Sequence, residues 1–424
     1  MSGLRHLLLS EETKIVYPAN ATVWEVTIPE GGATYQFRVW NNSSITFPDW
    51  SDGMRVDWGD GVIENVTPAN LNQSNVTPQH QYTTAGVYTV SCTGKQYNIR
   101  LANSNNNYGK YVTGFLRASD TLEDYESLLS DCSGITALPS NFKIPQKVHS
   151  VKSMLVGTSI AVLPSTFLLH ENIEHCSDLF GTAPIQYLPE GFTIPQSAAG
   201  SCSRIFSRGT RLRRLPDSFR IPDGTTDVNQ MFMNQNNIEE VGEQFKLPST
   251  VVTFDSYLGS AAKNASFDIN TVLSAINPTG DCRAANAFGG CGQMYGEAPA
   301  DKLWNNPNAN WLSTAGCFSF CFNLSNFGEI PATWDGGKVM LEDMAVDSDS
   351  AVDILLAKNQ LNYSNWGPYA NVFTPSGMPD GLSIVSVGND RHIQGTLAAG
   401  TYTFDVTLSN KWSSATATIT LIVK

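Results

Sequence analysis

A repeat of 25–26 residues between about 125 and 250 constrains the fold of this 424-residue chain more than any other feature. Each repeat carries an apolar pair, whose second members are Leu129, Leu155, Phe180, Phe206 and Phe232. A phenylalanine follows later in every repeat, at positions 142, 167, 192, 219 and 245. A unit this short cannot bury its own apolar edge, so successive coils must stack and share one core. We therefore expect Phe180, Phe206 and Phe232 to form one interior column, with neighbouring strands about 4.8 Å apart.

Strand-like alternation flanks the repeats on both sides. Residues from about 12 to 100 alternate apolar and polar side chains between turn residues, as in an antiparallel β-sandwich. The end of the chain has a similar pattern, after a segment, AVDILLAKNQL, that fits a short helix or a strand. The prediction is a mostly β chain with a β-sandwich at 1–100, a solenoid of about 26 residues per coil at 101–336 and a second β-sandwich at 337–424. The repeat weakens over 250–316, and 317–334 fits a further coil.

Composition narrows the classes of partner. The net charge is −13, which disfavours nucleic acid and anionic membranes, because both are bound through basic surfaces. Only 15% of residues are charged, and 41% are hydrophobic, enough for sizeable cores. The first residues, MSGLRHLLLSEETK, lack the apolar region of a secretory signal, and no stretch is long enough for a membrane span. We expect synthesis in the cytoplasm without a signal peptide, and no membrane insertion.

The run MRVDWGDG, residues 54–61, has two readings. Asp57 and Asp60 could form a carboxylate pair or part of a Ca²⁺ loop. A Ca²⁺ site needs six or more oxygen ligands, and only three or four are near in sequence. We favour a structural turn at Trp58, Gly59, Asp60 and Gly61, because glycine accepts positive φ and aspartate bonds its own backbone in turns. We also expect His80, at the start of the next strand pattern, to be structural.

The eight cysteines lack the spacing of a metal site. Cys317 and Cys321 supply only two of the four ligands that zinc requires. Cys176 and Cys202 occupy the same place in consecutive coils, so they should stack, and we favour reduced thiols over a disulfide. No G-x-S-x-G, H-E-x-x-H or Walker motif is present. We therefore expect no catalytic residues, no metal and no cofactor.

Arginines gather in the fourth coil, at positions 204, 208, 211, 213, 214 and 220. Adding one repeat to Arg213 and Arg214 gives Glu239 and Glu240, which predicts ion pairs between neighbouring coils. Arg208 and Arg211 would face Asn234 and Asn237 instead, and stay available for an anionic ligand such as a sugar acid. The remaining candidates for ligand or partner contact are aromatic residues in loops rich in Asn, Pro and Gly: Trp304, Trp311, Trp366 and Tyr369.

All three regions resemble modules of known surface proteins. VDWGDG followed by HQYTTAGVYTVSCTG (80–94) resembles the PKD-like, immunoglobulin-type module that opens many BspA-like proteins. DLFGTAPIQYLPEGF (178–192) resembles the BspA-like leucine-rich repeats. The segment from MPDGLSIV to GTYTFDV near the C-terminus resembles the putative-Ig module. The resemblance implies an Ig-like sandwich at each end of a leucine-rich-repeat solenoid.

Such modules occur on bacterial surfaces and on tailed-phage virions. Because the sequence shows no export signal or wall anchor, we expect a non-enzymatic structural protein of a tailed-phage virion, as a capsid decoration, head fibre or tail fibre. It would contact other virion proteins and adhere to a glycan or protein of the host surface, and it could form a homo-oligomer. The alternatives are a bacterial cell-surface adhesin, a tailspike-like glycosidase that uses paired carboxylates, and a purely stabilising decoration.

Overall fold

The computed structural model describes twelve stretches of the chain. They are residues 16–40, 54–66, 75–94, 96–102, 108–209, 211–321, 323–326, 329–334, 343–357, 372–388, 390–409 and 414–424. Two compact units, Met1–Ile173 and Glu174–Lys424, contain them. The chain is mostly β, and the described residues hold a single short α-helix, α1 (Ile269–Val272). None of their helices has the length and apolar character that crossing a membrane requires.

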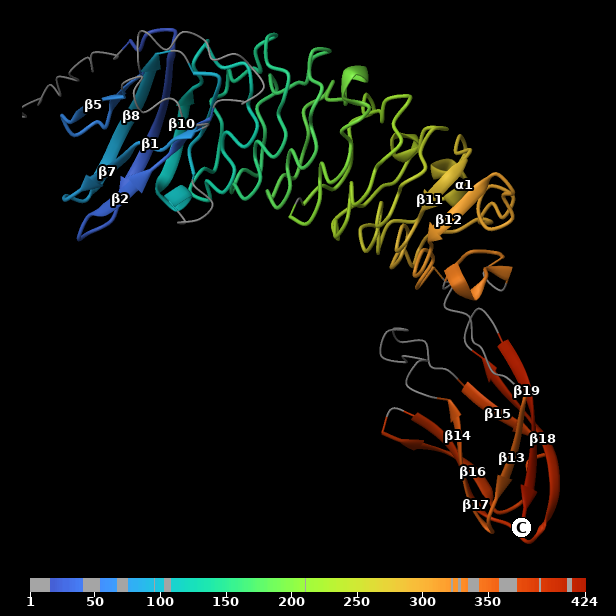
Figure 1. The fold of residues 1–424 in the computed structure, drawn as a ribbon. Helices are drawn as coiled ribbons and strands as arrows, with labels where there is room; N and C mark the ends of the chain where they lie inside the picture. The colour runs from blue at the N-terminus through green and yellow to red at the C-terminus, as the bar shows by residue number, and fades with distance from the viewer. Residues whose placement is uncertain are drawn as a thin grey trace, which may run out of the picture. The chain divides into compact units, whose positions relative to one another are not determined.

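The first unit begins with three antiparallel sheets (Figure 1). The largest has the order β10-β1-β8-β4-β5, and β1 pairs with both β8 and β10. Its strands are β1 (Ala21–Ile28), β4 (Met54–Asp57), β5 (Ile63–Val66), β8 (Gly86–Gly94) and β10 (Val112–Arg117). The smaller sheets hold β2 (Ala33–Gln36) with β7 (Gln79–Tyr82), and β6 (Asn75–Val76) with β3 (Arg38–Trp40) and β9 (Asn98–Arg100). Because β10 joins the largest sheet, that sheet extends past the boundary predicted at residue 100.

Buried aromatic rings fill the space between these sheets. Phe37 lies 5.0 Å from the ring of Trp24 on β1 and 5.7 Å from Trp58, and all three side chains are buried. Tyr35 packs edge-on against Trp58 at 6.4 Å. The alternation read from the sequence thus directs its large apolar side chains to one interior.

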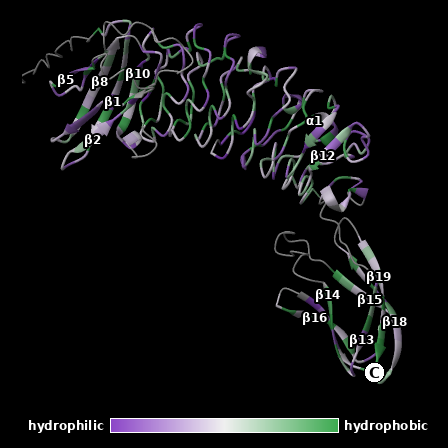
Figure 2. Ribbon diagram, in the orientation of Figure 1, coloured by the Kyte–Doolittle hydropathy of each residue, from purple (hydrophilic) through white to green (hydrophobic). Residues whose placement is uncertain are grey.

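Stacked coils follow these sheets in the first unit, and the second unit also contains stacked coils. In six coils the column residue donates its backbone N–H to the next coil: Leu129 to Met154, Phe180 to Ile205, Phe206 to Met231, Phe232 to Tyr257, Leu258 to Ala287 and Phe288 to Cys317, at 2.8–3.0 Å. The column residues are fully buried. The rings of Phe180 and Phe206 stack at 5.5 Å, and those of Phe206 and Phe232 at 5.1 Å. The predicted phenylalanine column is therefore present, and Figure 2 shows hydrophobic and hydrophilic residues alternating along the coils.

The backbone around each column residue forms turns that stack from coil to coil, although the repeat predicted strands there. We call these stacked turns the turn ladder. Residues two places before and two places after the column residue have positive φ, as at Arg204 (φ 56) and Arg208 (φ 70) around Phe206. Their N–H groups still donate to the next coil, Arg204 to Asn229 at 2.9 Å and Arg208 to Met233 at 3.0 Å. Non-glycine residues rarely adopt such φ values, and apolar periodicity carries no signal for them. The expectation of continuous strands along the column is thus wrong.

The coils lengthen after Leu258. Column residues Phe206, Phe232 and Leu258 follow one another at 26 residues, whereas Leu258, Phe288 and Phe318 follow at 30. This change of period explains why 250–316 matched the repeat poorly. The longer coils contain α1 and the parallel pair β11 (Gly280–Arg283) and β12 (Ala309–Ser313).

Short 3₁₀ segments occur in and beside the coils. They are η2 (Tyr108–Tyr111), η3 (Gln196–Ala198), η4 (Glu243–Phe245) and η6 (Ala332–Trp334).

The last described part of the chain forms two further sheets. One sheet holds β13 (Met344–Ser348), β19 (Ser414–Val423), β18 (Gly400–Ser409) and β15 (Val372–Ser376) in that order. The other holds β14 (Ala351–Ala357), β17 (Asp390–Thr396) and β16 (Leu382–Val387). Ile354 and Ile393 from one sheet share a core with Phe404 and Ile419 from the other. AVDILLA is therefore a strand, and the predicted boundaries at 100 and 336 remain predictions.

Candidate functional site

The DWGDG segment forms a tight turn between β4 and β5. Gly59 and Gly61 have φ values of 80° and 93°. The N–H of Gly59 donates to Oδ1 of Asp57 at 3.0 Å, and the N–H of Val62 donates to Oδ1 of Asp60 at 3.1 Å. A Cβ on Gly59 would lie 2.5 Å from the carbonyl oxygen of Thr89, so only glycine fits there.

Asp60 has a second partner in His80. Nε2 of His80 lies 2.7 Å from Oδ2 of Asp60, and the imidazole stacks on Trp58 at 5.2 Å. Burial by itself would raise the pKa of Asp60, but the hydrogen bonds from His80 and the Val62 N–H outweigh it and hold that pKa below its usual range. Both carboxylate oxygens of Asp60 are thus engaged in holding the turn.

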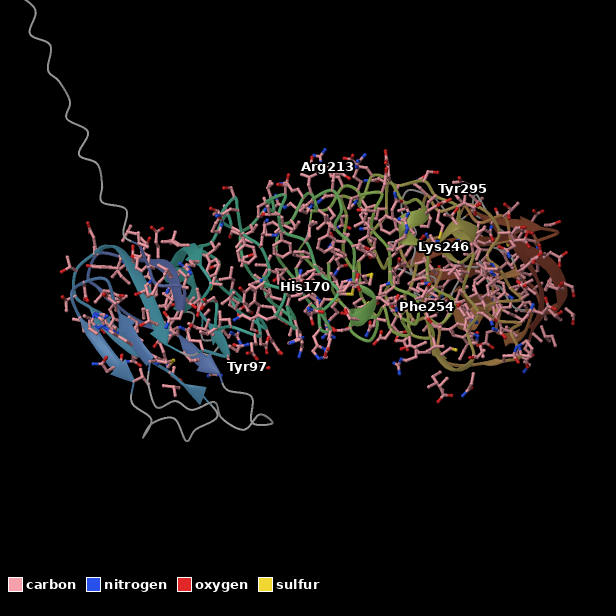
Figure 3. All side chains as sticks on the ribbon, turned by 90° about the horizontal axis from the view of Figure 1, so that it is seen from above. Tyr97, His170, Arg213, Lys246, Phe254 and Tyr295 are labelled. Carbon is pink, nitrogen blue, oxygen red and sulfur yellow. The ribbon has the colours of Figure 1, made fainter. Side chains whose placement is uncertain are left out.

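Two arginines of the fourth coil pair with carboxylates of neighbouring coils. Arg204 donates to both oxygens of Asp178 at 2.7–2.9 Å, and this hydrogen bonding raises the pKa of Arg204. Arg213 lies 3.3 Å from Glu239, as predicted from the repeat. Figure 3 shows Arg213 at the margin of the coils with its side chain directed outward.

Arg214 differs from the prediction. Its ion-pair partner is Glu190 of the preceding coil, at 3.9 Å, where the repeat predicted Glu240 of the following coil. A long exposed side chain can reach either neighbouring coil, so sequence spacing alone does not choose its partner.

Arg208 and Arg211 are both exposed and have no ion-pair partner in the part of the chain that the structure describes. Lys263, two coils further on, is likewise exposed and unpaired among the described residues. Arg208 donates its backbone N–H to Met233, which places Asn234 beside it in the next coil. Three cations without a described counter-charge therefore lie on the fourth and sixth coils of a chain whose net charge is −13.

Two of the fourth-coil arginines line a hollow of about 840 Å³ that is open to solvent. We call it the arginine hollow; its residues are Gln186, Arg211, Arg213, Asn236, Asn237, Ile238, Glu239 and Asn264. Arginine presents a planar fork that can donate two hydrogen bonds to one carboxylate. The asparagine amides both donate and accept, as a hydroxyl-rich ligand requires. This arrangement can bind a sugar acid, and its carboxylate, Glu239, lies 3.3 Å from Arg213.

A second hollow beside Arg214 and Arg220 is less suited to an anion. It is lined by carboxylates as well as arginines: Asp217, Glu240 and Glu243. Arg220 donates to the carbonyls of Asp217 and Phe219 at 2.6 Å, so part of its donor capacity is already used.

The loop tryptophans lie in an aromatic cluster. Trp311 packs edge-on against Trp334 at 4.8 Å, and Trp304 packs against Trp334 at 5.8 Å and Phe318 at 6.3 Å. The indole N–H of Trp311 donates to the carbonyl of Leu303 at 2.9 Å. Both side chains are half-buried and pack at the longer coils, and their predicted contact with a ligand or partner stays a prediction. Trp366 and Tyr369 lie outside the described residues.

All eight cysteines are buried free thiols. Sγ of Cys176 donates to the carbonyl of Ser201 at 3.0 Å, and Sγ of Cys202 contacts the Thr225 hydroxyl at 3.7 Å. The interaction between the two thiols raises the pKa of Cys176 and lowers that of Cys202. Burial raises the pKa of Cys317 and Cys321. Within the described stretches, no three His, Cys, Asp or Glu side chains converge as metal ligands would.

Sequence reasoning missed Lys263 and Asn264. Both follow the column residue Leu258 by five and six places, as Arg211 and Leu212 follow Phe206. Placing Leu258 in the column would have identified them, but it requires recognising a leucine where the preceding three coils have phenylalanine.

Comparisons with known proteins add little to this geometry. No protein-family model matches the chain, and no curated protein matches it. Among solved structures, the chain is similar to the functional domain of InlJ from Listeria monocytogenes, described as including a cysteine ladder. The identity is 11%, the match covers 77% of this chain and 84% of that chain, and the TM-score is 0.16. A likeness this weak carries no argument about fold or function.

Proposed function

We propose that this chain is a non-enzymatic display protein whose coils bind acidic glycans on a cell surface. In this proposal the coils are a leucine-rich-repeat solenoid with an Ig-like sandwich at each end. The recurring buried column and the paired sheets at both ends of the chain support that assignment.

One observation carries the binding proposal. Arg208, Arg211 and Lys263 are exposed cations without a described acidic partner, whereas Arg204, Arg213 and Arg214 of the fourth coil are paired with carboxylates. Exposed cations without a carboxylate partner keep their donors and charge available, so this surface is expected to attract an anionic ligand.

The exposure of the arginine hollow to solvent limits the affinity of such binding. Water and salt screen the arginine hollow, so each contact is worth little by itself. A glycan polymer offers many acidic groups, and several copies of a displayed protein would engage them together, which raises avidity by 10²–10⁴ without new contacts. We therefore propose weak, multivalent adhesion.

The setting on a tailed-phage virion rests on the module resemblance alone. We propose that one end of the chain docks on other virion proteins while the coils face the host, and a bacterial cell-surface adhesin would use the coils in the same way. Immunogold electron microscopy of purified particles and of producing cells distinguishes these settings. Label confined to the cell envelope would reject the virion.

The binding proposal is tested with the double variant Arg208→Asn/Arg211→Asn. Asparagine occupies the corresponding positions of the next coil, 234 and 237, and tolerates the positive φ of position 208. We expect the variant to bind an acidic polysaccharide such as polygalacturonate at least tenfold more weakly, a change of about 1.4 kcal/mol. Calorimetry or surface plasmon resonance measures it, with neutral dextran as the negative probe.

Lys246→Asn is the matched control, because Lys246 is exposed on the same unit but lines none of these hollows. It should bind as the parent chain does. Unchanged affinity in the double variant, or an equal loss in the control, would exclude the arginine hollow as the site.

A further inference from the structure

A third hollow lies next to the arginine hollow on the same coils. It has about 980 Å³ of space open to solvent and is lined by Met233, Asn234, Ser256, Gly259, Ser260, Lys263, Asn286, Gly289, Gly290, Ser319 and Phe320. We call it the amide hollow. It contains no acidic residue and one cation, Lys263, so it differs in chemistry from the arginine hollow.

The two hollows share two consecutive coils. Asn234 lines the amide hollow and Asn236 lines the arginine hollow. In the next coil Lys263 lines the amide hollow, and its neighbour Asn264 lines the arginine hollow. Residues one or two places apart thus border both, and a single extended ligand can occupy the two together.

The floor of the amide hollow is backbone, because glycine is required where the coils approach. A Cβ on Gly259 would lie 2.9 Å from the carbonyl oxygen of Asn286, and one on Gly289 would lie 3.0 Å from that of Gly316. Real side chains seldom tolerate such distances, so these positions stay bare and leave open space above them.

The walls supply hydrogen-bonding groups that the protein leaves unused. The side chains of Asn234, Ser256, Ser260 and Asn286 make no hydrogen bond within the described part of the chain. Each takes a positive φ, between 54° and 63° for the first three and 53° for Asn286. Two amides and two hydroxyls together offer donors and acceptors in the mixture that sugar hydroxyls require.

Phe320 adds an apolar surface to the same hollow. It is half-buried and has a φ of 65°, which is uncommon for a bulky residue. An aromatic ring at the edge of a polar hollow can pack against the apolar face of a sugar ring while the amides bind its hydroxyls.

We infer that the amide hollow is a subsite for an uncharged sugar that adjoins the acidic-sugar subsite of the arginine hollow. The ligand is then an acidic heteropolysaccharide in which acidic and neutral sugars are neighbours. This inference rests on the proposed function and names its substrate class more narrowly.

The test compares two acidic octasaccharides. A hyaluronan octasaccharide alternates acidic and neutral sugars, whereas an oligogalacturonate octasaccharide is acidic throughout. The variant is Asn234→Ser/Asn286→Ser, because serine already stands at the corresponding positions 260 and 256 of the coil between them, with the same positive φ. Asn305→Ser, at an exposed asparagine outside both hollows, is the control.

We expect the parent chain to bind the hyaluronan octasaccharide more tightly than oligogalacturonate. The double serine variant should lose about tenfold in hyaluronan affinity, or about 1.4 kcal/mol, and keep its oligogalacturonate affinity within about twofold. Circular dichroism and thermal unfolding check that the variant folds.

The other outcomes distinguish failure of the neutral-sugar subsite from failure of the proposed function. Equal affinity for the two octasaccharides, or an equal loss for both in the serine variant, would overturn the neutral subsite. If Arg208→Asn/Arg211→Asn still weakened binding at least tenfold in that case, the proposed function would stand without this inference. Failure of the parent chain to bind either octasaccharide would reject both.

Discussion

The coils before Leu258 and the coils after it achieve the same stacking with different sequences. Before it, column residues recur at 25–26 residues, and the rings of the phenylalanines among them stack face to face, as in Phe206 and Phe232 with an interplanar angle of 7°. After it, they recur at 30 residues, and glycine and alanine are common around Phe288. In both regions every second backbone N–H around the column residue donates to the next coil. The residues two places before and two places after the column residue have positive φ.

The difference shows which features stacking requires. The buried column residue and the turn ladder are common to both regions, whereas the length of each coil and the size of its surface side chains are free to change. Longer coils with small surface residues leave the amide hollow, and shorter coils with long charged side chains leave the arginine hollow.

The largest expected effect is a difference in stability loss between the column before Leu258 and the column after it. Phe206 contacts four phenylalanine rings, at 5.1–6.5 Å, and Phe288 contacts Phe254 and Phe318 at 6.4 and 5.7 Å. Phe206→Ala should lower the free energy of unfolding by about 3–5 kcal/mol, and Phe288→Ala by less, since aromatic pairs add about 0.5–1.5 kcal/mol beyond area burial. Urea unfolding measures both. A greater loss for Phe288→Ala would contradict the comparison.

Alanine substitutions at the coil-contact glycines should show a smaller difference in stability loss between the two regions. A Cβ on Gly209 would lie 2.2 Å from backbone atoms of Thr182, whereas one on Gly289 would meet its nearest atom at 3.0 Å. Gly209→Ala should cost about 1–3 kcal/mol or more, because backbone must move, and Gly289→Ala should cost less. Gly200→Ala, with no atom within 4 Å, is the control and should be neutral or slightly stabilising. Thermal unfolding compares the three variants.

The ion pairs between coils should contribute less still. Asp178→Asn removes the charge that Arg204 contacts and keeps a residue that tolerates positive φ, so it should cost at most about 1 kcal/mol. Asp255→Asn in the longer coils should cost less, because its side-chain oxygen can still accept the N–H of Ala285. Adding salt should shrink the first loss, since an exposed pair is screened. A loss independent of salt would indicate packing instead of charge.

The smallest expected difference between the two regions is in the reactivity of their buried thiols. Interaction with the Cys176 thiol lowers the pKa of Cys202, whereas burial raises the pKa of Cys291 to about 12. Because the thiolate is the nucleophile, Cys202 should be alkylated by iodoacetamide before Cys291, and as the pH is raised its alkylation rate should begin to increase at a lower pH than that of Cys291. Peptide mass spectrometry follows both sites, with Cys202→Ser as the control. Earlier labelling of Cys291 would show that local opening, and not pKa, governs access.

Much of the fold could be predicted from residues close in sequence. The column from Phe180 to Phe232 and the Arg213–Glu239 pair both follow from adding one repeat length. The column could not be extended to Phe288 and Phe318, because a fixed period of 26 does not reach them and leucine stands at 258. The turn ladder was also missed, since the residues with positive φ include Arg204 and Gln230, which give no turn signal.

The candidate site was predicted only in part. Arg208 and Arg211 were identified by their charge, but Lys263 and the amide hollow lie in the longer coils that the repeat did not align. The loop tryptophans Trp304 and Trp311 pack against Trp334, which no spacing rule connects to them.

The sequence by itself determined which side chains face inward, because apolar periodicity acts locally and each coil has to bury the same edge. Only the tertiary structure decided which cations remain unpaired and where the surface is hollow. Arg214 could reach Glu190 or Glu240, and the choice depends on how side chains from coils about 26 residues apart compete for space. Pairing and hollows arise between coils, and the distances that set them exist only once the coils have stacked.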